Sequence, residues 1–350
     1  MKKKIIKGIA FLLVFATCFF TVQAIFSGDG DDRDYRRIKS FFEQEENSLD
    51  AVFLGSSATY TFWQAPVAWN EYGITVFPLS NVKQPLLAAK FMIDDARKKQ
   101  PDALYIVNIA TVTEEYNFRI HRSIDGYPNT INKFKMIDYL CDLGDFSLSE
   151  RMEFYFPIIR FHSRWGELVP SDFNTPDDKH KGAVSNSLFM KGVEDVSGGI
   201  KDTDYYEPVS DQMAEGITDL MDYCEEEKVR VLFVVTPQEI TDKTRIGNLN
   251  TVIKMLEDRN FDVLNLMVDS EKIGLDPTKD YFNSTHTNIH GSIKFTDYFA
   301  RYLAENYGFE DKRGNESFSD WDVASEDYYK TISKFMTDKD YEIITKPEKK

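Results

Sequence analysis

Cysteine is scarce in this sequence, with three residues in 350, and they lie far apart at Cys18, Cys141 and Cys224. This spacing contains no paired arrangement of the kind that holds zinc. It also excludes a framework of several disulfides, although a single Cys141–Cys224 disulfide stays open because spacing cannot decide it. Packing of apolar side chains is therefore expected to hold the fold together.

Basic residues are also fewer than acidic ones. Lys and Arg number 42 against 58 Asp and Glu, which gives a formal net charge of -16 at pH 7. A protein that binds nucleic acid needs a basic surface, so nucleic acid is excluded as a general partner. We interpret the acidic excess as a contribution to solubility. Because 42% of the residues are hydrophobic, the chain can still bury a large core.

A long apolar run lies at the N-terminus. Lysines at positions 2–4 precede the run from Ile5 to Phe26, which is interrupted by Lys7 and Gln23. One membrane crossing takes about 20 apolar residues, and the basic flank orients the N-terminus toward the cytoplasm. A signal peptide cleaved near Ala24 is the alternative. We therefore expect a single-pass protein of the cell membrane with an extracytoplasmic domain, or a secreted protein if the segment is cleaved.

Short apolar runs alternate with helical patterns along the rest of the chain. Five runs have the length and composition of buried strands: 51–54, 74–79, 103–109, 229–235 and 261–266. Continuous apolar strands separated by helices indicate a parallel sheet that is covered on both faces. The sequence thus predicts an α/β fold with a doubly wound, flavodoxin-like, mostly parallel five-stranded sheet.

The same patterns divide the chain into segments. Residues 114–208 break the alternation and are too long for a simple loop. We interpret them as an inserted cap over the sheet, with peripheral packing as the alternative. The expected organisation is an anchor or signal peptide at 1–27, a linker at 28–48, the α/β domain at 49–307 with this insertion, and a charged helical tail at 308–350.

Two polar motifs follow strands near opposite ends of the domain. Gly55-Ser56-Ser57 comes directly after the first strand, and a turn-rich loop with His286 precedes the last helix. The carboxyl ends of parallel strands meet at one edge of the sheet, where ligands bind. A serine there needs a histidine as base, and a third group to orient the ring. Asn283 and Asp280 are both candidates for this third group. Gly-Ser-Ser alone is also typical of a helix N-cap.

Further polar residues are candidates for binding the substrate. Ser56, Asn81 and Asn108 lie at strand ends and are candidates for an oxyanion or substrate site, or for ordinary turn groups. Arginine suits carboxylates and phosphates, so arginines in the insertion are candidates for holding an anionic polymer. Ordinary surface ion pairing is the alternative for these arginines, which are Arg119, Arg122, Arg160 and Arg164.

These motifs resemble the SGNH/GDSL-type serine hydrolases. In that family a Gly-Asp-Ser block follows the first strand and an Asp-x-x-His block precedes the last helix. Here Ser57 matches the nucleophile and His286 the base, while Ser56 and Asn283 replace the two aspartates. The family's oxyanion glycine falls near Ser80, and its Gly-x-Asn-Asp block falls near residues 109–111, where neither the glycine nor the asparagine is present.

More narrowly, the chain is similar to membrane-anchored members found beside membrane-bound O-acyltransferases in Gram-positive cell envelopes. The resemblance implies an esterase or O-acyltransferase that acts on acyl esters, acetyl esters foremost, of envelope polysaccharides or teichoic acids through an acyl-serine intermediate. It implies no cofactor or metal, and a membrane-bound O-acyltransferase as a partner. Two alternatives stay open: a non-catalytic glycan-binding or assembly protein, and a lipase-like esterase that uses the aromatic insertion as an acyl groove.

Overall fold

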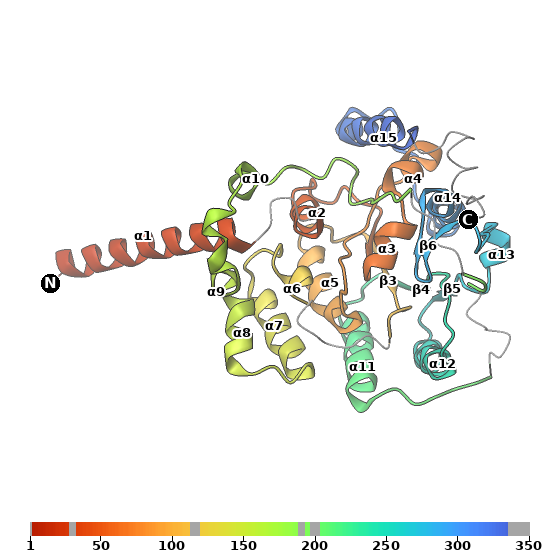
Figure 1. Cartoon of the computed structure of the whole chain (residues 1–350), viewed down its shortest axis with the longest axis horizontal. Coiled ribbons are helices and arrows are strands. Elements are labelled where there is room, and N and C mark those ends of the chain that lie inside the picture. The colour runs from red at the N-terminus through yellow and green to blue at the C-terminus, as the bar shows by residue number, and fades with distance from the viewer. Residues whose placement is uncertain (1, 28–32, 113–119, 188–192, 197–203, 335–350) are drawn as a thin grey trace, which may run out of the picture.

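The computed structural model describes residues 2–27, 33–112, 120–187, 193–196 and 204–334 (Figure 1). Its centre is a parallel sheet of five strands in the order β2-β1-β3-β4-β5, which confirms the predicted α/β class. The bounds are β1 Ala51–Leu54, β2 Val76–Phe77, β3 Leu104–Asn108, β4 Val231–Val235 and β5 Val263–Asn265. β2 is shorter than predicted, since Pro78 follows it and lacks the N–H that pairing needs.

Helices surround this sheet. Those before the third strand are α1 Lys2–Ser27, α2 Arg33–Phe42, α3 Ser57–Phe62, α4 Ala65–Tyr72, η1 Leu86–Ala88 and α5 Ala89–Arg97. The segment between β3 and β4 contains α6 His121–Ile124, α7 Ile131–Leu143, α8 Leu148–Tyr155, α9 Pro157–Phe161, η3 His162–Gly166, α10 Pro170–Phe173 and α11 Asp211–Glu226. The remainder are α12 Lys243–Glu257, α13 Ser270–Ile273, α14 Ile289–Tyr307, η4 Glu316–Phe318 and α15 Ser319–Ile332.

The central strands are covered on both sides. Every residue of β1 and β3 is buried, as their unbroken apolar sequences predict. Aromatic rings from the helices continue the core: Phe53 on β1 contacts Trp63, and both contact Phe299 on α14. The two internal cysteines are buried as free thiols, so the disulfide that spacing left open is absent.

Segments outside the central domain also pack against it. On α2, Ile38 and Phe41 are fully buried in the main core, although the region was expected to be a linker. On α15, the Trp321 ring packs against Trp69 of α4, and the Trp69 indole donates a hydrogen bond to Asp322. Both segments therefore contribute to the packing of the folded domain.

The apolar helix α1 extends away from the sheet and contacts the insertion (Figure 1). It is long and apolar enough to cross a membrane, by its length and composition. α9 packs against its C-terminal end, and α7 packs against α5 beside the sheet. The return segment of the insertion lies on α3, where the Val184 N–H donates to the Tyr60 carbonyl.

The carboxyl edge of the sheet brings distant segments together. Gly55, which follows β1, forms a parallel bridge with Ser80, which follows β2. The predicted histidine loop contains a short antiparallel hairpin of β6 Tyr281–Asn283 and β7 His286–Thr287. The N-cap Asn288 then accepts hydrogen bonds from the first turn of α14. This hairpin, rather than an irregular loop, sets the position of the histidine.

Gly55 is a conformational requirement of this edge, because its φ of 153° is a value that residues with a side chain rarely adopt. An added Cβ would also lie 2.2 Å from Thr59 Oγ1 and 2.8 Å from Asn108 Cβ. We expect Gly55→Ala to lower the free energy of unfolding by about 1–3 kcal/mol, measured by thermal unfolding in detergent. Gly166→Ala is the matched control, since nothing lies within 4 Å of its added Cβ. Equal stability of the two variants would contradict the prediction.

Candidate active site

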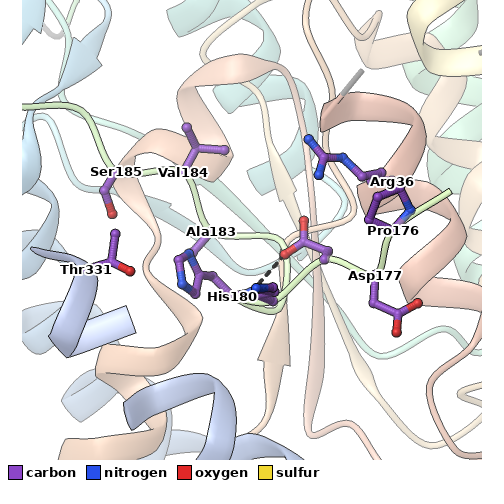
Figure 2. Close-up of a pocket in the computed structure, with 10 residues that line it drawn as sticks. Arg36, Pro176, Asp177, His180, Ala183, Val184, Ser185 and Thr331 are labelled. Atoms are coloured by element: carbon purple, nitrogen blue, oxygen red, sulfur yellow. Dashed lines mark hydrogen bonds between the residues drawn. The ribbon is translucent and has the colours of Figure 1, made fainter. Parts of the chain in front are cut away.

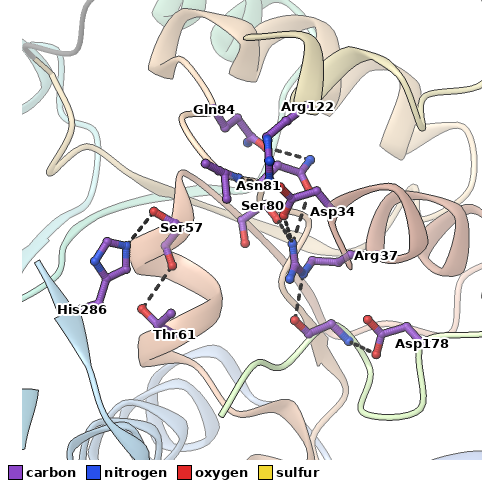
Figure 3. Close-up of polar contacts among 12 residues, drawn as sticks. Asp34, Arg37, Ser57, Thr61, Ser80, Asn81, Gln84, Arg122, Asp178 and His286 are labelled. Carbon is purple, nitrogen blue, oxygen red and sulfur yellow. Dashed lines mark hydrogen bonds and ion pairs between the residues drawn. The ribbon is translucent and has the colours of Figure 1, made fainter. Parts of the chain in front are cut away.

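Ser57 and His286 meet at the carboxyl edge of the sheet (Figure 3). Ser57 is the first residue of α3, directly after β1 and the Gly55-Ser56 turn, and its side chain is partly buried. Its Oγ lies 2.6 Å from Nε2 of His286, which comes from β7. A serine hydroxyl in direct hydrogen-bond contact with an imidazole is the arrangement that nucleophilic catalysis needs.

Asn283 orients the opposite side of the ring. Its Oδ1 lies 2.8 Å from Nδ1 of His286, and it also accepts hydrogen bonds from the Thr285 N–H and hydroxyl. Three donors thus converge on one amide oxygen, which fixes both the amide and the ring. With the imidazole hydrogen on Nδ1, Nε2 is left as the acceptor for the Ser57 hydroxyl.

The His286 ring is a weak base in this environment. Burial, with a smaller effect from the Lys83 ammonium, lowers its pKa from 6.5 to about 4. The ring is therefore neutral at pH 7 and able to accept a proton. Because the folded pKa lies below the unfolded value, the unfolded chain binds more protons between about pH 4 and 6.5. This residue therefore makes the fold less stable as the pH falls through that window.

Asp280, the alternative third group, does not reach the ring. Its fully buried carboxylate accepts hydrogen bonds from the Asp276 N–H and the Lys294 ammonium, both at 2.7 Å. Asp280 precedes β6, whereas Asn283 pairs with His286 in the hairpin, so only Asn283 has the required register. Across the described residues, no group of three His, Cys, Asp or Glu side chains is arranged to hold a metal ion.

The three predicted oxyanion or substrate-binding residues are buried near the site. Ser56 is the N-cap residue of α3, but its side chain makes no capping hydrogen bond. The Asn108 amide donates to the hydroxyls of Thr59 and Thr236, which occupies both of its hydrogens. Asn81 contacts Gln84 and a buried arginine, Arg37. Asn108 is therefore structural, and Asn81 belongs to a second polar cluster.

Arg37 on α2 organises that second cluster, and sequence reasoning missed it (Figure 3). The side chain is almost completely buried, and its Nη1 donates to Asp34, to the Ser80 carbonyl at 2.8 Å and to Asn81 Oδ1 at 3.3 Å. Its Nε donates to the Gly182 carbonyl, and its guanidinium stacks on the Tyr60 ring. The amphipathic helix pattern at 33–42 was the available signal, but it does not reveal which charged residue is buried.

The candidate arginines that the structure describes do not contact Ser57 or His286. Arg119 lies outside the described residues. Arg160 is on α9, where Nη2 contacts both carboxylate oxygens of Asp125 at 2.6 and 2.5 Å, and its guanidinium packs on Phe161. Arg122 contacts Asp34 at 3.4 Å near the Arg37 cluster, and Arg164 pairs with Asp172. The three candidate arginines that the structure describes are thus engaged by carboxylates of the same chain.

A separate cavity of about 410 Å³ lies between the return segment of the insertion, α2 and α15 (Figure 2). Arg36, residues 176–180, residues 183–185 and Thr331 line it. His180 at this cavity contacts Asp327 at 3.1 Å. Ser57 and His286 are not among the lining residues, so we treat the cavity as distinct from the candidate active site.

The role of Asn283 predicts how the His286 ring titrates. We expect one histidine NMR signal, identified by its loss in His286→Gln, to titrate with a pKa of about 4. Asn283→Asp places a negative charge at Nδ1 and should raise this pKa by about one unit or more. The control removes both charges of the ion pair between the buried Asp280 and the partly exposed Lys294, as Asp280→Asn with Lys294→Gln, and should leave the pKa near that of the unaltered chain. If the pKa of His286 changes in the Asp280→Asn/Lys294→Gln double variant and not in Asn283→Asp, Asn283 is not the group that orients the ring.

No protein-family model matches the sequence, and no curated protein matches it. A function for this chain is therefore inferred from the geometry of the Ser57–His286 site, together with the resemblance of its two motifs.

Proposed function

We propose that the chain is a serine hydrolase or O-acyltransferase of the SGNH/GDSL type, and that Ser57 carries the acyl group. The proposal depends on one observation, the 2.6 Å contact between Ser57 Oγ and His286 Nε2. Two residues so distant in sequence are brought together by the fold in an arrangement that ordinary helix capping does not need. The neutral ring and the oriented Nδ1 give additional support.

The chemistry follows from these atoms. Ser57 Oγ attacks the carbonyl carbon of an ester while His286 Nε2 takes the hydroxyl proton. The tetrahedral intermediate collapses, the C–O bond to the leaving alcohol breaks, and His286 returns the proton to that alcohol. Water or a second hydroxyl then attacks the acyl-serine while His286 takes its proton. The bond between the acyl carbon and Ser57 Oγ breaks, and His286 returns the proton to Ser57. Water gives an esterase, and a sugar or polymer hydroxyl gives a transferase.

Ser80 is the group best placed to stabilise the oxyanion. Its hydroxyl is completely buried and has no hydrogen-bond partner, which is costly unless something else satisfies it. The bridge to Gly55 places Ser80 beside the turn that leads to Ser57, and Figure 3 shows Ser80 between Ser57 and Arg37. Arg37 holds the Ser80 carbonyl, so the hydroxyl is presented by a fixed backbone.

The finer features of the fold and the substrate belong to the same proposal. We infer a doubly wound, flavodoxin-like sheet from the order β2-β1-β3-β4-β5, with α14 in contact with both α3 and α4, and α5 in contact with α11 as a second group. The return segment at Val184 supports a cover over α3. The apolar helix α1 and its basic flank support a membrane-anchored enzyme outside the cytoplasm. The resemblance of the two motifs supports acylated envelope polysaccharides or teichoic acids as substrates and a membrane-bound O-acyltransferase as partner.

The nucleophile can be tested with a fluorophosphonate probe, which reacts with activated serines. We expect the full chain to be labelled, Ser57→Ala to be unlabelled, and His286→Gln to react about 100-fold more slowly because the base is lost. Ser149→Ala, on the exposed start of α8, is the control and should be labelled normally. An unlabelled full chain would instead favour the non-catalytic glycan-binding or assembly protein.

The oxyanion role of Ser80 predicts a loss of turnover. Ser80→Ala should lower kcat for hydrolysis of a soluble acetyl ester by about 100-fold, with little change in KM, because the hydroxyl acts in the transition state. Ser123→Ala is a matched control, since Ser123 also has a buried hydroxyl with no hydrogen-bond partner but lies on α6. If the two variants have the same kcat, Ser80 has no oxyanion role.

A further inference from the structure

The C-terminal end of α1 is enclosed by helices of the insertion. Most of α1 is exposed, but the Phe19 ring contacts Phe156 with 5.8 Å between centroids, and Phe26 contacts Trp165 at 4.5 Å. Between them, the Gln23 side chain accepts a hydrogen bond from the Ile158 N–H at 2.8 Å. α8, α9 and α10 form a layer across this end of α1 (Figure 1).

The contact with Phe19 sets the depth of this layer. An α-helix rises about 1.5 Å per residue, so Phe19 lies about 10 Å along the axis before Phe26. The apolar run from Ile5 to Phe26 has about the length of one bilayer crossing, which leaves Phe19 on the bilayer side of the boundary when α1 spans it. The α8–α9 junction at Phe156 is then at the depth of the lipid headgroups and the first acyl carbons.

The residues that this layer exposes suit such a position. Large apolar side chains are exposed at α8, α9, η3 and α10: Leu148 by 76%, Ile159 by 43%, Trp165 by 65%, Val169 by 40% and Phe173 by 64%. A soluble surface rarely concentrates so many large apolar residues in one short segment. Tryptophan in particular is enriched where a membrane meets water.

The buried charges of the segment are compensated internally. Arg160 is paired with Asp125, and Arg164 with Asp172 at 2.9 Å. The side chains of both arginines are mostly buried, so these cations are not presented as isolated charges. Pairing of this kind lowers the cost of placing the segment next to a region of low dielectric constant.

We propose that residues 148–173 form a membrane collar that rests on the lipid bilayer around α1, with their exposed apolar side chains in the headgroup region. The occupant of this surface is lipid rather than a second protein, because the surface is continuous with the segment that enters the bilayer. The inference rests on the proposed anchoring by α1. Its consequence is a fixed height and orientation of the Ser57 site above the membrane.

The tryptophan distribution provides the test. Of the four tryptophans, Trp63, Trp69 and Trp321 are buried, whereas Trp165 is exposed in the collar. The full chain is reconstituted in phosphatidylcholine vesicles with and without bromine near the headgroup end of the acyl chains. The difference in fluorescence between the unaltered chain and Trp165→Phe is the emission of Trp165. We expect the brominated lipid to quench roughly half of this emission, because the ring lies in the interface.

Two further variants, both made with Trp165→Phe, separate the possible failures. Val323→Trp places a tryptophan at a position on α15 that is 66% exposed, close to the 65% of Trp165, and should not be quenched. Phe15→Trp lies near the middle of the run from Ile5 to Phe26, so it reports insertion of α1 in vesicles brominated near the ends of the acyl chains, where it should be quenched. If Phe15→Trp is quenched and Trp165 is not, the collar is refuted while the anchor stands. If neither is quenched, both are refuted, and probe labelling of Ser57 still tests the enzyme separately.

Discussion

The hydrogen bond between Ser57 and His286 joins residues that are 229 positions apart, and the proposed chemistry depends on it. Two constraints produce it. The parallel sheet places the end of β1 at its carboxyl edge, and the β6–β7 hairpin after β5 brings the imidazole to the same edge. Neither motif carries chemistry alone, because a serine without a base is a weak nucleophile at neutral pH.

The neutral third group distinguishes this site from a triad with a carboxylate. Asn283 fixes the tautomer and the ring plane through Oδ1, but it contributes no charge to stabilise the imidazolium. Burial disfavours the same cation and leaves the ring with a pKa of about 4. The base is therefore always available at neutral pH but weak. Such a site suits an activated ester or a slow transfer better than rapid hydrolysis of unactivated bonds.

The sequence was sufficient for the five strands of the parallel sheet, though not for the length of β2 or for the β6–β7 hairpin, and for the Ser57–His286 pair. Continuous apolar runs, and the position of a loop after a strand, are local signals. It was insufficient for the partners of these residues. Asp280 and Asn283 lie three positions apart in one polar stretch, and only the hairpin register shows which of them faces the ring. In the sequence, Asn108 and Asn81 are equally good candidates for binding an oxyanion. Only the structure shows that both amide hydrogens of Asn108 are donated to threonine hydroxyls.

Arg37 links α2 to the turn that holds Ser57. It lies on α2, a few residues after α1 in the chain, and it holds the backbone of Ser80 beside the Ser57 turn. Asp34 neutralises the buried guanidinium, so the link is a compensated ion pair with its hydrogen bonds made inside the fold. Because Arg37 also binds the Gly182 carbonyl, the position of Ser80, the proposed oxyanion donor, is fixed by contacts from α2 and from the return segment of the insertion. The proposed collar would then orient this preformed site as one unit on the bilayer.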